Sequence, residues 1–290
     1  MTEARIHNRG YVAYGGVRLG PGRAMVDLAY HTVQRVLGLK RSNWQKVMPA
    51  VALAVAFVPA IVFIGMAAAV PRGEELGFDS PTNYYEVINF GILLFTAFVA
   101  PEAVCTDRRS GLLGLYLASP LHRSTYLVAK FGAVAAVLAM MTLGPTLLML
   151  IAFTLADAGP DGASDWLTEF GRVLASGLAL AVFWTALSLA VSSLSSRRSL
   201  AGVAIFFGIL VSAALGDGLA AGADLGDSFA LVNMFDLPLE AVVRIYGEVN
   251  DGDSPLGRVD TWAVYTTLIG LTAAFGGFAQ WRYQRIEVTR

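Results

Sequence analysis

Six long stretches of the chain contain no charged residue, and each of them is mostly apolar. A helix needs about 20 such residues to cross the ~30 Å hydrocarbon core of a bilayer. Four stretches meet this length, a fifth has 18 residues, and the stretch 87–101 has only 15, so it must include its flanks. The pattern predicts an all-α integral membrane protein with one transmembrane domain over 1–290. The six predicted transmembrane helices lie at about 47–71, 84–105, 131–156, 173–196, 199–216 and 261–281.

The segment 22–39, within the polar region 1–46, has a helical pattern with two unlike faces. Apolar side chains recur at i, i+4, i+7 and i+11, and polar side chains occupy another face. This pattern predicts an amphipathic helix in the membrane interface; the alternative is a cytosolic helix packed on a partner. The apolar face consists of Val26, Tyr30, Val33 and Leu37, and the polar face of Asp27, His31, Gln34 and Arg35.

The segments that connect the spans alternate in charge. The first, third, fifth and seventh contain 17 of the 21 Lys and Arg, and the second, fourth and sixth contain 17 of the 22 Asp and Glu. Basic segments next to spans remain in the cytoplasm. We therefore expect a multi-pass protein of the plasma (cytoplasmic) membrane with both termini cytoplasmic. The basic segments then face the membrane surface and do not indicate a nucleic-acid partner.

The fifth span and the outer segment after it carry two further signals. Gly208, Ser212 and Gly216 recur every four residues, which forms a flat stripe suited to close helix packing. We interpret this stripe as a helix-packing interface, either within the chain or with a second copy. The outer segment 217–260 is the longest one, and Pro238 can open a short helix over 239–245.

Residues suited to covalent chemistry are sparse. All three histidines lie outside the predicted spans, so an intramembrane Ser–His site lacks its base. The sequence has no metal-ligand spacing of His, Cys and Asp, and no G-x-x-x-x-G-K-[ST] motif for phosphate. We expect no catalytic residue, no metal and no cofactor in this chain. Glu102, at the inner end of the second span, is expected to form an interfacial ion pair with a nearby arginine, while Tyr84 and Tyr85 are expected in the outer aromatic belt.

The inner loop between spans two and three is the most distinctive segment, reading PEAVCTDRRSGLLGLYLASPLHRSTYLVAKF over 101–131. An acidic residue is followed by a basic pair, a leucine-rich stretch, a Ser-Pro step and a Tyr-Leu-x-x-Lys motif. This loop resembles that of the permease subunits of type-2 ABC transporters, which have the type V exporter fold. The resemblance covers about thirty residues in motif and the whole chain in architecture.

The resemblance implies a function and partners. The loop would form a coupling helix that contacts a separate ATPase subunit, and the segment 22–39 would be the connecting helix of the family. Two permease subunits, identical or related, would form the substrate pathway with two ATPase subunits, which bind the ATP and Mg, and transport would be export. The alternative is a membrane scaffold or a channel-like oligomer without transport.

A coupling helix needs an apolar face that fits a pocket on the partner, and basic residues that meet acidic groups or lipid headgroups. The residue before a proline is disfavoured in a helix, so Ser119 should end this helix and cap the next one, with Pro120 in its first position. The alternative is a lipid-facing helix without a partner. The predicted coupling residues are Arg108, Arg109, Leu112, Leu113, Tyr116, Leu117, Ser119 and Pro120.

Overall fold

The computed structural model describes residues 20–39, 43–69, 81–222, 226–248 and 254–286. This part of the chain contains helices and turns and no strand. Within it, six helical segments are long and apolar enough to cross a membrane. The prediction of an all-α protein with six spans is thereby confirmed.

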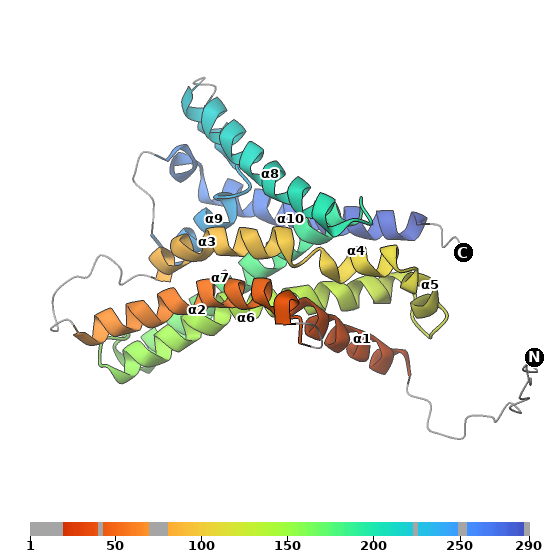
Figure 1. The fold of residues 1–290 in the computed structure, drawn as a ribbon. Helices are drawn as coiled ribbons and strands as arrows, with labels where there is room; N and C mark the ends of the chain where they lie inside the picture. Colours follow the sequence, from red (N-terminus) through yellow and green to blue (C-terminus); the bar gives the residue numbers. More distant parts are fainter. Residues whose placement is uncertain (1–19, 40–42, 70–80, 223–225, 249–253, 287–290) are drawn as a thin grey trace, which may run out of the picture.

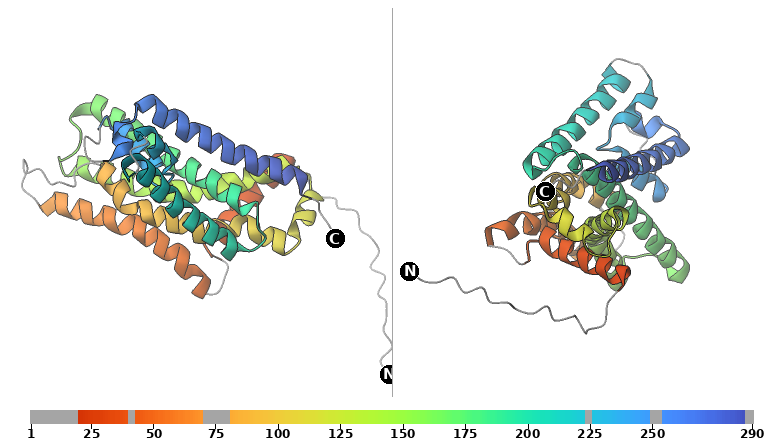
Figure 2. Two further views of the ribbon diagram at one scale, coloured as in Figure 1. Left: turned by 90° about the horizontal axis from the view of Figure 1, so that it is seen from above. Right: turned by 90° about the vertical axis from the view of Figure 1, so that its right-hand side faces the viewer.

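The helices follow the predicted order (Figures 1 and 2). The first half of the chain forms α1 (Pro21–Val36), α2 (Asn43–Ala69), α3 (Pro81–Phe98), α4 (Glu102–Arg109), α5 (Leu112–Leu117) and α6 (Arg123–Leu155). The second half forms α7 (Gly162–Ser192), α8 (Arg198–Asp217), the short turns η1 (Gly218–Gly222) and η2 (Asp227–Val232), α9 (Leu237–Ile245), η3 (Pro255–Arg258) and α10 (Thr261–Arg285).

Two of the long helices begin well before the apolar stretch that predicts them. Helix α6 starts at Arg123 and α7 at Gly162, whereas the predicted spans start at 131 and 173. No proline interrupts either lead-in segment, so the polar residues there continue the helix. At 33 residues, α6 is about 50 Å long by its rise per residue. Both helices therefore project beyond a hydrocarbon core of ~30 Å.

The second span is broken at its inner end. Helix α3 ends at Phe98 and α4 starts at Glu102, with Pro101 between them. Proline has no N–H to donate within a helix, which favours a break at this position. Helix α4 then leads into α5 through Gly111, whose φ of 69° lies in the left-handed region that glycine tolerates. The chain turns sharply here and presents the short α5 at the end of the molecule (Figure 1).

Two tyrosines that the sequence placed at the outer membrane interface lie instead in the interior between α2, α3 and α6. Tyr84 and Tyr85 are fully buried and do not form an outer aromatic belt. The Tyr84 hydroxyl donates to the Ala56 carbonyl at 3.0 Å, and the Tyr85 hydroxyl donates to the Thr142 carbonyl at 3.3 Å. A buried tyrosine needs such a partner, and the neighbouring helices supply it, so these residues hold α3 between α2 and α6.

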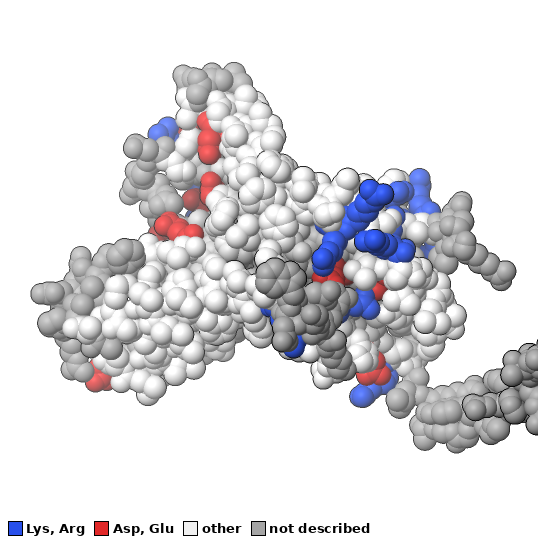
Figure 3. Space-filling view, viewed as in Figure 1, with Lys and Arg blue, Asp and Glu red and all other residues white. Residues whose placement is uncertain are grey.

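Charged side chains separate toward the two ends of the molecule. In Figure 3, most Lys and Arg lie at one end and most Asp and Glu at the other, with a broad surface free of charge between them. We call these the basic end, which includes α4, α5 and the start of α8, and the acidic end, which includes η2 and α9. Helix α1 and the end of α10 both lie at the basic end (Figure 1).

The acidic end is closed by α9, which includes the short helix predicted after Pro238 but begins at Leu237. Its Arg244 is buried, pairs with Glu240 at 2.8 Å and donates to the Thr261 hydroxyl at 2.9 Å. These contacts fix α9 against the first turn of α10.

Candidate coupling site at the basic end

Helix α4 lies at the centre of the basic end. It contacts α1, α5, α6, α7 and α8. Seen from the basic end, in the right-hand view of Figure 2, α4 and α5 lie among the ends of the longer helices. Five of its eight residues are buried, including the acidic residues Glu102 and Asp107.

Asp107 is the hub of a buried ionic cluster. Its carboxylate accepts hydrogen bonds from Arg35 of α1 and from the Tyr126 hydroxyl of α6, the latter at 2.9 Å. It also forms an ion pair with Lys130 Nζ of α6 at 2.6 Å, and both side chains of this pair are fully buried. Two cations thus share one carboxylate. A buried carboxylate persists only when it is paired and hydrogen-bonded, and here three partners on two helices meet that need.

Lys130 extends this cluster to two further elements. Its ammonium donates to the Thr32 hydroxyl of α1 at 2.9 Å. The same nitrogen lies 5.8 Å from the ring centroid of Tyr116 in α5 and 5.4 Å from that of Tyr126. A cation at this distance from an aromatic ring is attracted to it. The cluster therefore links α1, α4, α5 and α6 through side chains that are distant in sequence.

Arg35 provides the link that faces the surface. One of its guanidinium nitrogens bonds Asp107 and another donates to the Tyr116 hydroxyl at 3.5 Å. Burial lowers the pKa of Arg35, but the hydrogen bond and the charge of Asp107 raise it, and the net direction is upward from its ordinary value. Arg35 therefore stays charged throughout the physiological pH range.

The predicted apolar face of the coupling helix is only partly available to a partner. Leu113 is 7% exposed and belongs to the core of the chain, so the expectation that it enters a pocket on a partner is corrected. Tyr116 and Leu117 are half-buried against the same core. Leu115, which the sequence pattern did not single out, is 68% exposed and lies on the outer side of α5. Half-buried Leu112 opens this helix.

Ser119 and Pro120 are exposed, but neither begins the next helix. The Ser119 hydroxyl donates back to the Tyr116 carbonyl and so closes the end of α5. Helix α6 starts at Arg123 after His122, whose backbone N–H donates to the Thr125 hydroxyl at 2.9 Å. The predicted cap at Ser119 is therefore wrong, because the turn after Pro120 adds two residues before the helix starts.

The basic pair at the end of α4 is divided between two environments. Arg108 donates to the carbonyls of Ser193 at 2.6 Å and Ser195 at 3.4 Å, which satisfies the free carbonyls at the end of α7. Arg109 is exposed. Nearby, the Glu102 carboxylate pairs with Arg198 of α8 at 3.1 Å. Glu102 and Arg108 thus attach α4 to the turn between α7 and α8.

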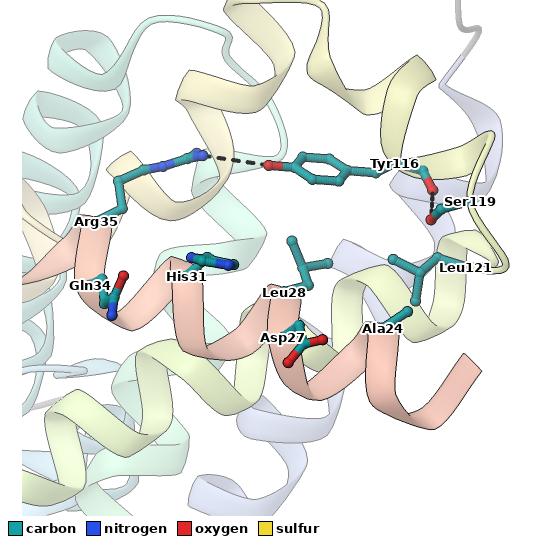
Figure 4. Close-up of a pocket in the computed structure, with 9 residues that line it drawn as sticks. All are labelled: Ala24, Asp27, Leu28, His31, Gln34, Arg35, Tyr116, Ser119 and Leu121. Carbon is teal, nitrogen blue, oxygen red and sulfur yellow. Dashed lines mark hydrogen bonds between the residues drawn. The ribbon is translucent and has the colours of Figure 1, made fainter. Parts of the chain in front are cut away.

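A pocket of about 470 Å³ opens between α1 and the α5 segment. Figure 4 shows His31, Gln34 and Arg35 along α1, with Tyr116 and Ser119 from the other side. The Gln34 side-chain oxygen is buried and accepts no hydrogen bond from the described residues. The pocket combines apolar side chains with polar ones from both α1 and the α5 segment. It is lined by Ala24, Asp27, Leu28, His31, Gln34, Arg35, Tyr116, Ser119 and Leu121.

The three small residues of the stripe on α8 have different surroundings in the structure. Ser212 and Gly216 pack within the chain: the Ser212 hydroxyl accepts from the Met234 N–H at 3.3 Å, and a Cβ on Gly216 would lie 2.7 Å from the Asn233 nitrogen. Gly208 faces open space. Closer helix packing occurs at Gly202, where a Cβ would lie 2.5 Å from the Ala97 carbonyl oxygen of α3. The sequence pattern did not point to Gly202.

The ionic cluster was also missed from the sequence. Arg35 and Asp107 are 72 residues apart, so no local pattern connects them. One local signal existed, because Tyr126 and Lys130 of the Tyr-Leu-x-x-Lys motif are four residues apart and share a helical face. A lysine that enters a span beside a tyrosine indicates a buried acidic partner.

Comparison with known proteins agrees with this architecture. Residues 55–288 match the ABC-2 family transporter protein family, and the chain belongs to that family. It is a transmembrane, permease subunit of an ABC transporter. It is similar to the probable ABC transporter permease protein NosY of Pseudomonas aeruginosa, with 29% identity over 201 residues. That alignment covers 66% of this chain and 64% of the relative, so less than two thirds of the relative's length.

Proposed function

We propose that this permease is driven by a separate ABC ATPase subunit that contacts it at α5 and the adjoining face of α1. The observation that supports this is the buried cluster around Asp107. It ties α5 to α1 and α6, so a displacement of α5 is transmitted to the end of α1 and the start of α6. A buried, fully hydrogen-bonded network is stiff, and stiffness is what mechanical coupling requires.

The surface offered to the ATPase combines exposed residues with a pocket. Leu115, Ser119 and Pro120 are exposed at this end. The pocket between α1 and α5 lies beside them and is lined by Leu28, His31 and Gln34 among others. An exposed apolar side chain next to a pocket that has polar groups in its lining is typical of a protein–protein contact. The residues of the predicted coupling helix thus act in two ways: Leu113 and Tyr116 hold α5 in place, and Leu115 makes the contact.

The charge separation supports an orientation. With the basic end in the cytoplasm, both termini are cytoplasmic and the acidic end faces outward. In this arrangement the ATPase binds ATP and Mg on the cytoplasmic side, and two permease subunits form the substrate pathway. The direction of transport is export, on the family resemblance of the inner loop.

The proposed contact at the α1–α5 surface is tested by substituting one exposed leucine at each end of the molecule and comparing the two variants. Leu115→Asp should abolish recovery of the ATPase with the tagged permease, because the carboxylate would be placed in the contact. Leu167→Asp is the matched control, since Leu167 is 65% exposed on α7, close to the 68% of Leu115. The measurement is the molar ratio of ABC ATPase to permease after purification from native cells, by quantitative mass spectrometry. Full recovery of the ATPase with Leu115→Asp would refute the contact.

The second candidate is a scaffold or channel-like oligomer without ATP-driven transport. A single measurement distinguishes it from the permease function. Purified protein in planar bilayers would conduct ions without ATP if it were a channel. A permease that depends on its ATPase should show no steady current in the absence of that subunit.

A further inference from the structure

A second hollow at the basic end lies apart from the α1–α5 pocket. It opens between the end of α4 and the turn that joins α7 to α8, and its volume is about 740 Å³. Four of its six lining residues are arginines. The lining residues are Arg108, Arg109, Ser196, Arg197, Arg198 and Ser199.

The four arginines are not equivalent. Arg108 is held by the carbonyls at the end of α7, and Arg198 is paired with Glu102. In the described part of the chain, the guanidinium groups of Arg109 and Arg197 take part in no hydrogen bond or ion pair. Glu102 therefore pairs with only one of the four arginines, and two others have all their guanidinium donors available among the described residues. A planar guanidinium binds a phosphate through two parallel hydrogen bonds.

An apolar stripe leads away from the hollow along α8. Leu200, Val203 and Phe207 occupy i, i+3 and i+7, and each is at least half exposed. Arg197, at the N-terminal boundary of α8, lies three residues before Leu200. The ten residue steps from Arg197 to Phe207 span about 15 Å along a helix, which is half of the ~30 Å hydrocarbon core. The stripe therefore has the length of one membrane leaflet, and the arginines lie at its head.

We propose that this hollow binds the phosphate headgroup of an anionic lipid, whose acyl chains lie on the stripe of Leu200, Val203 and Phe207. The charge matches a phosphate, and the apolar surface continues from the charged hollow without an intervening polar residue on that face. An acidic partner protein would use the charge but would leave the stripe unexplained. This inference depends on the membrane placement of α8 and is independent of the ATPase contact at α5.

The test uses the full chain, without ATPase, in phosphatidylcholine nanodiscs that contain a small fraction of spin-labelled lipid. The electron paramagnetic resonance spectrum gives the fraction of spin-labelled lipid whose motion the protein restricts. Comparing this fraction for labelled phosphatidylglycerol and labelled phosphatidylcholine gives their relative association constants. Arg109→Gln with Arg197→Gln should reduce the preference for phosphatidylglycerol about tenfold or more, since each basic residue near an anionic lipid contributes about one kcal/mol. Both side chains are exposed and form no hydrogen bond or ion pair with the described residues, so the variant should fold.

The matched control removes two positive charges from the same end but away from the hollow, as Arg23→Gln with Arg285→Gln, and should keep the preference. An equal loss in control and variant would overturn the site, because a general surface field would then explain binding. Retention of the preference in the hollow variant would overturn it directly. A preference for phosphatidylglycerol that millimolar inorganic phosphate abolishes would show that the hollow takes free phosphate in place of the lipid, and would overturn the lipid assignment.

Two further outcomes decide between occupants. Loss of ATPase recovery with unchanged lipid preference in the hollow variant would assign the hollow to the partner subunit and refute the lipid. Efficient disulfide cross-linking between two copies through Val203→Cys would place a second copy on the stripe and refute it as well. The lipid assignment requires that neither occurs.

Discussion

Lys130 Nζ lies 2.6 Å from Asp107 Oδ2, and both side chains are fully buried. This pair differs from a surface salt bridge, because neither charge has water to replace a lost partner. Arg35, Tyr126 and Thr32 complete the hydrogen bonding around it. Breaking a buried pair by removing one member leaves an uncompensated charge, which is far more costly than removing both members. The first prediction follows from this asymmetry.

Asp107→Asn should destabilise the permease by about 3–5 kcal/mol, the usual cost of an unpaired buried charge. Lys130 and Arg35 would then face a neutral amide in a dry environment. The measurement is the unfolding midpoint of the purified chain in detergent. The double variant Asp107→Asn, Lys130→Met should recover part of the loss, since it removes the stranded ammonium. A double variant that is less stable than Asp107→Asn alone would contradict this account.

Glu102→Gln should have a much smaller effect, although Glu102 also lies in α4 and also pairs with an arginine. The side chain of its partner Arg198 is 58% exposed, so water can replace the lost carboxylate. Exposed ion pairs contribute about 0–1 kcal/mol. The same unfolding assay at low and high salt should show a small difference that salt reduces. A loss as large as that of Asp107→Asn would mean that the Glu102 contact is as dry as the buried one.

Two glycines of α8 should differ in how the stability of the chain responds to a larger side chain. Gly202→Ala should destabilise the folded chain by about 1–3 kcal/mol, the usual cost of overpacking, because its Cβ would collide with the Ala97 carbonyl. Gly208→Leu should leave the stability of a single chain unchanged, since it faces open space. Weaker dimerisation of Gly208→Leu in detergent would place this glycine against a second copy. An unchanged dimer would place it against lipid.

The orientation is checked by the accessibility of single cysteines. Asp161→Cys, at the start of α7, should react with a membrane-impermeant maleimide in intact cells, and Arg109→Cys should react only after the cells are opened. Both positions are exposed, and the native Cys105 is buried and gives a low background. The opposite labelling pattern would reverse the orientation of the permease.

The apolar runs predicted the six spans because a bilayer imposes both their length and their lack of charge. The contacts at the basic end were not predictable in the same way. Leu113 and Leu115 are two residues apart in the same short helix, and the sequence offers no reason to bury the first and expose the second. Their environments depend on where α1 and α6 lie, and these positions follow from packing between distant segments. The cluster around Asp107 also depends on packing between distant segments, so the sequence did not predict it.

The cap at Ser119 failed for a local reason. A Ser-Pro step is a good helix start by propensity, but the hydroxyl had a nearer acceptor in the Tyr116 carbonyl. Serine side chains often bond backbone groups of the preceding turn. The competition between two local hydrogen bonds is therefore enough to move the start of α6 to Arg123.

Arg35 carries the link between α1 and the rest of the cluster, and its removal should loosen α1 without unfolding the permease. In Arg35→Gln, the Asp107 carboxylate keeps Lys130 and Tyr126, so no buried charge is stranded. Backbone amides of Pro21–Val36 should exchange hydrogen faster, while those of α6 remain protected.

The raised pKa of Arg35 adds a second expectation. A cationic group whose pKa is raised on folding contributes stability below its unfolded pKa and loses it only above the folded value. Protection of α1 should therefore be the same across about pH 6 to 9 in the parent chain, after correction for the intrinsic exchange rate. Unchanged exchange of α1 in Arg35→Gln would show that apolar contacts of Leu28 and Val36 hold this helix alone.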